Sequence, residues 1–160
     1  MLTPEQGLTA VKTGWSGVKA WVEYWRAGRI QIISPRPLEM LEGKEPFVPG
    51  PAERFTYAVR GKLKRRPKDH EIWLLIEDPS GCVWPQGFSR VQHNQDTGDW
   101  VGRVHTQFSE PKIVAVVAPP TSVDFFRYYQ RVGNKTNHEA LTRVPVECTN
   151  WDSVQARLPP

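Results

Sequence analysis

The densest cluster of charged side chains is a basic run whose chemistry would be the binding of anions. Nine consecutive residues carry six cations, namely Arg60, Lys62, Lys64, Arg65, Arg66 and Lys68. Cations at this density attract phosphate groups, so one interpretation is a surface for a nucleic acid or an anionic lipid bilayer. The other is a solvated connector whose charges keep a sheet edge from pairing with another chain. We favour the connector, because aromatic side chains placed for base stacking are not evident nearby and the net charge is only +4.

A second candidate is the rim Trp84-Pro85-Gln86-Gly87. Pro85 cannot donate to a strand ladder and Gly87 permits a turn, so we expect the Trp84 indole and the Gln86 amide at the end of a sheet. Loops held by a rigid scaffold are common recognition sites. We therefore predict that Trp84, Gln86 and Gly87 contact a partner, with the turn at residues 94–98 as an additional candidate. The alternative is that Gln86 satisfies buried backbone groups of the next loop.

Motifs of known catalytic or metal sites are missing from the sequence. It contains no G-x-S-x-G, no G-x-x-x-x-G-K-[ST] and no G-x-G-x-x-G. No zinc-ligand spacing occurs among its histidines and cysteines, which are His70, His93, His105, His138, Cys82 and Cys148. Glu77 and Asp78 are adjacent, so on a strand they point to opposite faces and cannot cooperate as acid and base. We predict no metal, no cofactor and no enzymatic activity, with a small hydrolase of unrecognised site as the alternative.

The composition is that of a globular domain. Of the 160 residues, 39% are hydrophobic and 24% are charged, which excludes wholesale disorder and a collagen-like fibre. No apolar run is long enough to span a bilayer, and no signal peptide is visible at the N-terminus. We therefore expect a cytoplasmic location, with peripheral membrane association as an alternative. The two cysteines are expected to be free thiols, although a single disulfide is the other possibility.

Residues 1–28 differ from the rest of the chain. Their apolar positions recur at helical spacing, at Trp15, Val18, Trp21, Val22 and Trp25. Gly28 stands where a helix would end. We predict an amphipathic helix that docks on the sheet, on a second copy or on a partner; residues 18–25 could also form a strand.

From Arg29 onward the pattern is that of β-structure. We predict strands at residues 29–33, 55–60, 71–77, 82–84, 88–93, 99–105 and 112–118, with turns at 78–81 and 94–98. Residues 35–51 are expected to form a loop with at most one short edge strand at 38–41. A short helix is predicted at about residues 122–132, and the tail from Lys135 shows no periodicity.

About seven short strands at roughly ten-residue spacing predict an immunoglobulin-like antiparallel β-sandwich over residues 29–160, with a barrel as the alternative. The strands 71–77 and 112–118 are apolar on both faces and should lie in the middle. We expect the helix to cap one end or edge, and Trp73 and Trp100 to face inward.

Four sequence blocks resemble a poorly characterised class of bacterial immunoglobulin-like β-sandwich domains, often found C-terminal to a membrane helix or a signalling module. The blocks are Ile72-Trp73-Leu74-Leu75, Trp84-Pro85-Gln86-Gly87, Trp100 with Gly102-Arg103-Val104, and Val114-Ala115-Val116-Val117-Ala118. The resemblance covers about residues 29–158 and implies an accessory recognition module in a bacterial signalling or envelope-associated system. A spanning helix is not expected here, because Lys12, Lys19, Glu23 and Arg26 interrupt the N-terminal segment.

The sequence as a whole thus predicts a non-enzymatic module for protein–protein interaction. The partner would be another protein or a second copy, contacted through the N-terminal helix or a sheet edge. Binding of a nucleic acid or an anionic surface through residues 60–68 is the alternative.

Overall fold

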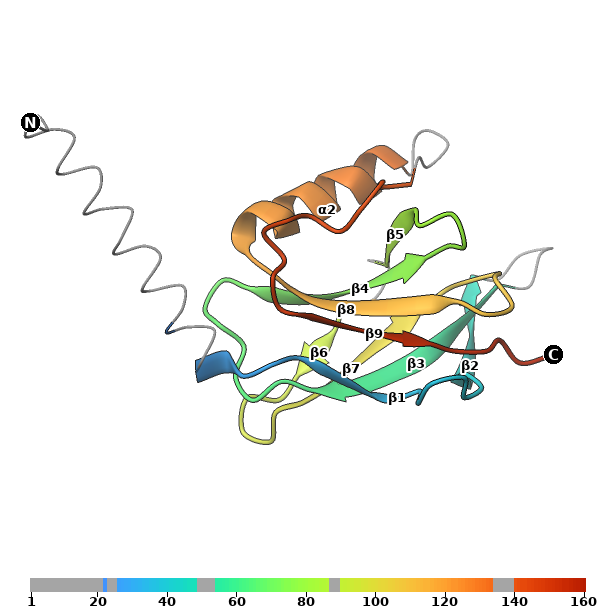
Figure 1. Cartoon of the computed structure of the whole chain (residues 1–160), viewed down its shortest axis with the longest axis horizontal. Helices are drawn as coiled ribbons and strands as arrows, with labels where there is room; N and C mark the ends of the chain where they lie inside the picture. The colour runs from blue at the N-terminus through green and yellow to red at the C-terminus, as the bar shows by residue number, and fades with distance from the viewer. Residues whose placement is uncertain (1–21, 23–25, 49–53, 87–89, 134–139) are drawn as a thin grey trace, which may run out of the picture.

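The computed structural model describes residues 22, 26–48, 54–86, 90–133 and 140–160. Two antiparallel sheets pack face to face, and a helix lies on the outer face of one of them (Figure 1). The mainly β prediction and the face-to-face arrangement of two sheets are confirmed.

The five-stranded sheet is built around β3 (Arg54–Lys62). β7 (Asp99–Val104) pairs with one side of β3, and β6 (Gln92–His93) follows beyond it. The other side of β3 is shared by β1 (Gln31–Ser34) and β2 (Glu42–Val48). Tyr57 and Val59 of β3 lie in the core, as their alternation with polar residues predicts.

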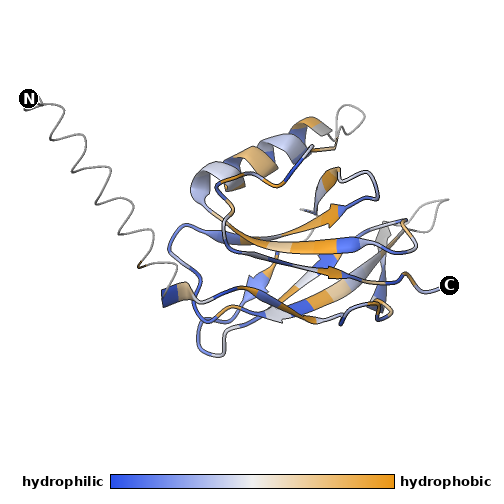
Figure 2. Cartoon of the chain, viewed as in Figure 1, coloured by the Kyte–Doolittle hydropathy of each residue, from blue (hydrophilic) through white to orange (hydrophobic). Residues whose placement is uncertain are grey.

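The four-stranded sheet has the order β5 (Val83–Gln86), β4 (Glu71–Glu77), β8 (Lys112–Ala118) and β9 (Trp151–Gln155). β4 and β8 are the middle strands, as predicted. Their hydrophobic residues form the most continuous apolar stretch of this sheet in Figure 2. Leu74 of β4 faces the core between the sheets, whereas Leu75 faces the opposite side.

That opposite side is covered by helix α2 (Pro120–Gly133), which confirms the predicted helix but corrects its position. The helix does not cap an end or edge: Val123 and Phe126 pack against Leu75 and Val116. β4 and β8 are therefore apolar on both faces because a second sheet covers one face and a helix covers the other. Pro120 opens the helix, where its missing N–H costs no helical hydrogen bond.

Trp73 is buried but faces α2, which corrects the prediction that it points between the sheets. Its ring lies 5.1 Å from that of Phe126, centroid to centroid. Trp100 does lie in the core between the sheets, 2% exposed. Both faces of β4 are buried, one by the other sheet and one by α2. The prediction that Trp73 is buried therefore did not decide which of the two it contacts.

The two sheets approach each other along β1 and β9. Asn150 accepts from Ile30 N–H at 3.0 Å and donates to Gly28 O at 2.9 Å. Asp152 accepts from Ile32 N–H at 2.8 Å. Asp152 thus bridges strands of different sheets, and Asn150, just before β9, bonds the segment just before β1. Together they tie the start of the domain to its last strand.

The described part of the chain contains nine strands, more than the seven predicted. β2 lies within residues 35–51, which were predicted to be mainly a loop, and β9 lies in the unpatterned tail. Both strands pair along one side only and carry many polar residues, so neither shows clean alternation. Pro46 is tolerated in β2 because edge strands need fewer N–H donors.

Most of the predicted N-terminal helical segment lies outside the described residues, which include only Val22 and residues 26–28 of it. Arg26 and Ala27 are helical, and Gly28 follows with a φ of +69°. Glycine in this conformation commonly terminates a helix.

Candidate functional site

The basic run begins on a central strand. Arg60 and Lys62 are exposed on the outer face of β3, which β7 flanks on one side and β1 and β2 flank on the other. The charges of these two residues therefore do not protect an unpaired sheet edge.

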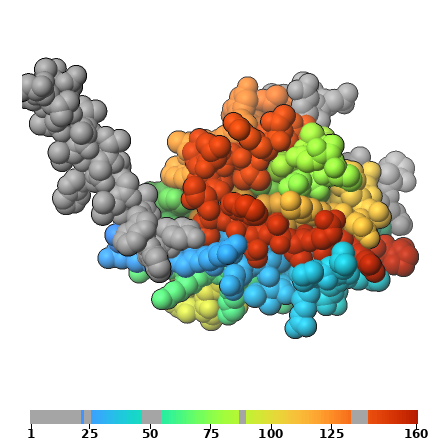
Figure 3. Space-filling view, in the orientation of Figure 1, coloured from blue at the N-terminus to red at the C-terminus, as the bar shows by residue number. Residues whose placement is uncertain are grey.

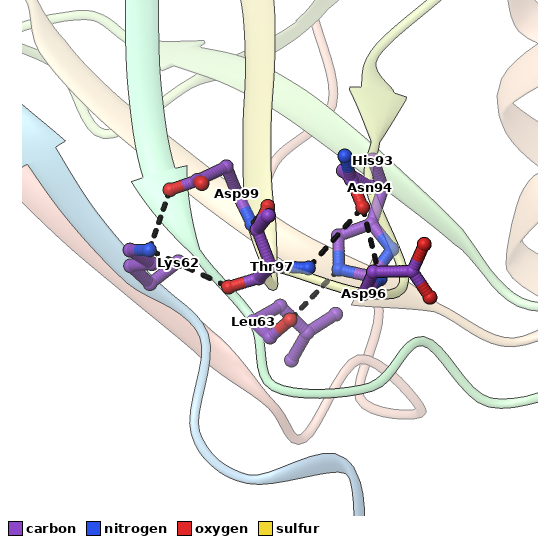
Figure 4. Close-up of polar contacts among 7 residues, drawn as sticks. All are labelled: Lys62, Leu63, His93, Asn94, Asp96, Thr97 and Asp99. Carbon is purple, nitrogen blue, oxygen red and sulfur yellow. Dashed lines mark hydrogen bonds and ion pairs between the residues drawn. The ribbon is translucent and has the colours of Figure 1, made fainter.

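The connector after β3 is anchored rather than loosely attached. Leu63 is fully buried, and its N–H donates to Gly98 O at 2.8 Å. His93 Nε2 lies 2.7 Å from Leu63 O, and because a carbonyl only accepts, this nitrogen carries the proton (Figure 4). The cations that follow Leu63 therefore start from a defined position.

The turn between β6 and β7 holds the start of the connector, because Gly98 bonds Leu63 and Asp99 pairs with Lys62. Asn94 Oδ1 accepts from the N–H groups of Asp96 and Thr97, at 2.9 and 3.2 Å. Lys62 Nζ lies 2.6 Å from Asp99 Oδ1, across the paired strands (Figure 4). The hydrogen bond from Lys62, followed by that from Thr97, lowers the pKa of Asp99 below its usual value.

The fold adds two further cations to this region. Arg65 N–H donates to Ala27 O at 3.1 Å, so the exposed Arg26 and Arg29 lie beside the connector. We call residues 26–29, 60–69 and 94–99 the basic end; they gather at the end of the sandwich on the left of Figure 1. The basic end holds eight cations and three carboxylates, a formal charge of +5 against +4 for the whole chain. The rest of the chain is therefore nearly neutral.

The six predicted anion-binding residues are not equivalent. Lys62 is paired with Asp99, and Arg66 is half-buried, with Nη1 donating to His70 O at 3.1 Å. Within the described part of the chain, no ion pair or side-chain hydrogen bond engages the other four, which are exposed: Arg60, Lys64, Arg65 and Lys68. These four, with Arg26 and Arg29, are the cations available to a partner.

The predicted rim is engaged within the molecule. Gln86 Oε1 accepts from His105 N–H at 2.7 Å, and its Nε2 donates to Trp84 O at 3.2 Å. The Trp84 indole packs against the core, and its Nε1 lies 3.4 Å from Asp78 Oδ2. Gly87 lies outside the described residues. Gln86 thus links the two sheets, and partner contact at the rim stays a prediction.

A second exposed surface, more apolar than the basic end, lies beside α2. It was not predicted from the sequence. Four large side chains are 46–70% exposed there: Phe125, Tyr128, Val146 and Trp151. Figure 3 shows the chain before β9 lying against α2 on this face. Two hollows of about 430 and 520 Å³ flank that chain and share Pro145 and Val146 in their walls. We call the four exposed residues and these hollows the helix-side surface.

A signal for this surface was present in the sequence. Phe125, Phe126, Tyr128 and Tyr129 crowd one short helix, and adjacent helical residues cannot all face one sheet. Phe126 is buried on β8, whereas Phe125 is 46% exposed. When two adjacent residues of such a helix are aromatic, one of the two side chains is therefore expected to be exposed to solvent.

Other side chains with chemical potential serve structural roles. Glu77 pairs with Lys112 at 3.1 Å, and Asp78 caps the turn to β5, accepting from Ser80 N–H at 2.8 Å. The hydrogen bond from the Ser80 hydroxyl is the main reason that the pKa of Asp78 is lowered. Cys82 and Cys148 are free thiols. Among the described residues, no three histidine, cysteine or carboxylate side chains group as metal ligands would.

Comparison of the chain with protein-family models, with curated proteins and with solved structures finds no match. The immunoglobulin-like resemblance therefore stays a prediction from the sequence blocks. Within the described part of the chain, no helix has both the length and the apolar character that crossing a bilayer requires.

Proposed function

We propose that the chain is a non-enzymatic recognition module that binds a partner protein through the helix-side surface. The observation that carries the proposal is the exposure of Phe125, Val146 and Trp151 around two adjoining hollows. Tyr128, which is also exposed, follows Phe125 by three residues on α2. Exposed apolar clusters of this kind mark interaction sites, and aromatic side chains are enriched in protein interfaces. The immunoglobulin-like character belongs to the same proposal, supported by the two face-to-face antiparallel sheets.

The arrangement of the residues on the helix-side surface, as well as their exposure, favours a protein as the ligand. Val146 stands between the hollows, with Phe125 on the wall of one and Trp151 on the wall of the other. Arg143 and Glu147 border the first hollow, so the apolar centre has polar neighbours of both signs. An apolar centre with a polar rim is the usual anatomy of a protein interface.

The proposal is tested by affinity capture with the full chain and two substituted forms. The test form carries Phe125→Ala and Trp151→Ala. The control carries Leu38→Ala and Met40→Ala, which remove two half-exposed apolar side chains outside the helix-side surface. We expect one protein to be retained by the wild type and the control and lost by the test form.

The captured protein is then purified and its affinity measured. Removal of two interface anchors should weaken binding at least tenfold, which corresponds to about 1.4 kcal/mol. Equal affinity for the test form and the wild type would contradict the proposal. Concentration-dependent sedimentation of the wild type, abolished in the test form, would identify the partner as a second copy.

A further inference from the structure

A hollow of about 810 Å³ lies on the five-stranded sheet, with walls on β1, β3, β6 and β7. Arg60 pairs directly with Val101 across the strands, and Lys62 pairs with Asp99. Trp100, between Asp99 and Val101 on β7, faces the core, so these four side chains lie on the outer face of the sheet. We call this concave surface the sheet hollow. It lies on the opposite side of the sandwich from α2, which covers the four-stranded sheet.

The walls of the sheet hollow carry groups that contact sugar-phosphate chains. Arg60 and Lys62 supply positive charge, and the exposed Gln92 and Asn94 supply amide side chains. Guanidinium, ammonium and amide groups are the usual contacts of phosphate and sugar oxygens. Ile33, which is 53% exposed, gives the wall an apolar part that can contact sugar carbons.

The positive charge continues from the sheet hollow into the connector. Leu63 is buried, and its N–H donates to Gly98 O at 2.8 Å, so the connector begins at the wall of the hollow. Three exposed cations follow along it: Lys64, Arg65 and Lys68. Charges spread along a hollow and a connector suit a polyanion, whose own charges repeat along a chain, better than a single small anion.

We propose that the sheet hollow and the three connector cations bind the phosphate backbone of a nucleic acid, without reading its base sequence. Contacts to the backbone position a nucleic acid and need no aromatic side chain. A nucleic acid is favoured over an anionic bilayer because Arg60 and Lys62 line a concave surface. A narrow strand can enter such a surface, whereas a planar bilayer cannot follow it.

Asp99 opposes this binding. Its Oδ1 lies 2.6 Å from Lys62 Nζ, so the carboxylate engages Lys62 until a phosphate replaces it (Figure 4). Both side chains are at least half exposed, and an ion pair of this kind is weak enough to exchange. The carboxylate also repels a phosphate that enters the hollow. Loss of the Asp99 charge should therefore strengthen binding, whereas loss of the cations should weaken it.

The experiment measures the fluorescence anisotropy of labelled random-sequence DNA, as duplex and as single strand, titrated with the full chain. For each tenfold rise in salt, the logarithm of the binding constant falls by about 0.9 per phosphate contact for a duplex and about 0.7 for a single strand. Four contacts, made by Arg60 and the three connector cations, give slopes of about −3.6 and about −2.8. Either form supports the proposal, and the tighter binding tells which form the site prefers.

The test form carries Arg60→Gln and Lys64→Gln. It should bind at least about tenfold more weakly at about 0.05 M salt, with a slope about two units shallower. The matched control is Arg143→Gln with Arg157→Gln, which removes the same charge from two exposed positions outside the basic end. It should bind nearly as the wild type does. Circular dichroism melting of each form verifies that the domain is folded.

Asp99→Asn tests the sheet hollow in the opposite direction. It frees Lys62 for a phosphate, so it should strengthen binding and steepen the slope by about one unit. Asp124→Asn is the control, because it removes the same charge from an exposed position on α2, on the other layer of the molecule. It should leave both the affinity and the slope nearly unchanged.

Four results would overturn the proposal. Absence of binding to both forms of DNA at about 0.05 M salt, or binding that salt does not weaken, would remove the phosphate contacts. Equal weakening by the two arginine-containing pairs would remove the role of the basic end. Equal effects of Asp99→Asn and Asp124→Asn would remove the role of the sheet hollow. Binding to vesicles that contain phosphatidylserine, without binding to DNA, would identify an anionic bilayer as the partner.

The helix-side surface is tested separately. Capture of a partner protein there depends on Phe125 and Trp151, neither of which lines the sheet hollow. Failure of DNA binding therefore leaves the proposed function standing, and failure of protein capture leaves the nucleic-acid site standing.

Discussion

The indole of Trp100 lies against Gly61, its directly paired neighbour on β3, so closely that a Cβ at position 61 would overlap it. The carbonyl oxygen of Gln31 would meet the same Cβ. Trp100 is 2% exposed and belongs to the core between the sheets. The absence of a side chain at Gly61 therefore makes room for the largest aromatic residue of the core.

Gly61→Ala should destabilise the domain by about 3 kcal/mol, since overpacked core positions cost about 1–3 kcal/mol and this one meets backbone as well as an indole. Gly81→Ala is the control, because its Cβ would meet nothing within 4 Å although its φ is +86°. Backbone strain alone should cost about 1–2 kcal/mol there. Urea unfolding measures the free energy of unfolding of both variants. Equal losses of that free energy would show that the contact with Trp100 is unimportant.

The contact between Trp73 and Phe126 should dominate the attachment of α2. Trp73→Ala removes a 7% exposed indole and should cost about 3–5 kcal/mol. Trp151→Ala, at a 49% exposed position, should change stability by no more than about 0.5 kcal/mol. Combining Trp73→Ala with Phe126→Ala in a double-mutant cycle should give a coupling of about 0.5–1.5 kcal/mol. A coupling of zero would contradict direct packing of these rings.

Gln86→Ala should lower stability by about 1–3 kcal/mol, because the His105 N–H loses the Gln86 acceptor and a link between the sheets is removed. Gln86→Glu keeps an acceptor oxygen for His105 and should lose less. Gln92→Ala, an exposed glutamine on β6, is the control and should be nearly neutral. If Gln86→Ala leaves stability unchanged but weakens the binding of a partner protein, the rim is a contact surface.

Cys148 should make stability depend on alkaline pH. Burial is the main reason that the pKa of its thiol is raised. The thiol is protonated in both states below the unfolded pKa, so its favourable contribution is complete there. As the pH rises through about 8.5, the unfolded thiol ionises first and the contribution is lost.

Chemical denaturation at about pH 7 and about pH 10 tests this, because Cys148→Ala should remove part of the alkaline loss seen in the wild type. A thiol reagent should modify the half-buried Cys82 in the folded protein and reach Cys148 only on unfolding. Identical pH dependence in both forms would show that Cys148 does not contribute.

Much of the fold follows from local patterns in the sequence. Alternation along β3 and β7, apolar residues on both faces of β4 and β8, and the turn at Asp78–Gly81 each depend on residues close in the chain. These elements were predicted because period and turn chemistry are local properties. β2 and β9 were not, because an edge strand with polar residues takes its structure from the strand it pairs with.

The candidate sites divide in the same way. The sequence by itself determined the basic run at residues 60–68. Only the tertiary structure decided that Arg26 and Arg29 join that run, that Gln86 binds His105, and that Trp73 faces the helix rather than the other sheet. Each of these depends on segments distant in sequence being brought into contact. Such contacts are chosen by the packing of the whole molecule, which no single segment encodes.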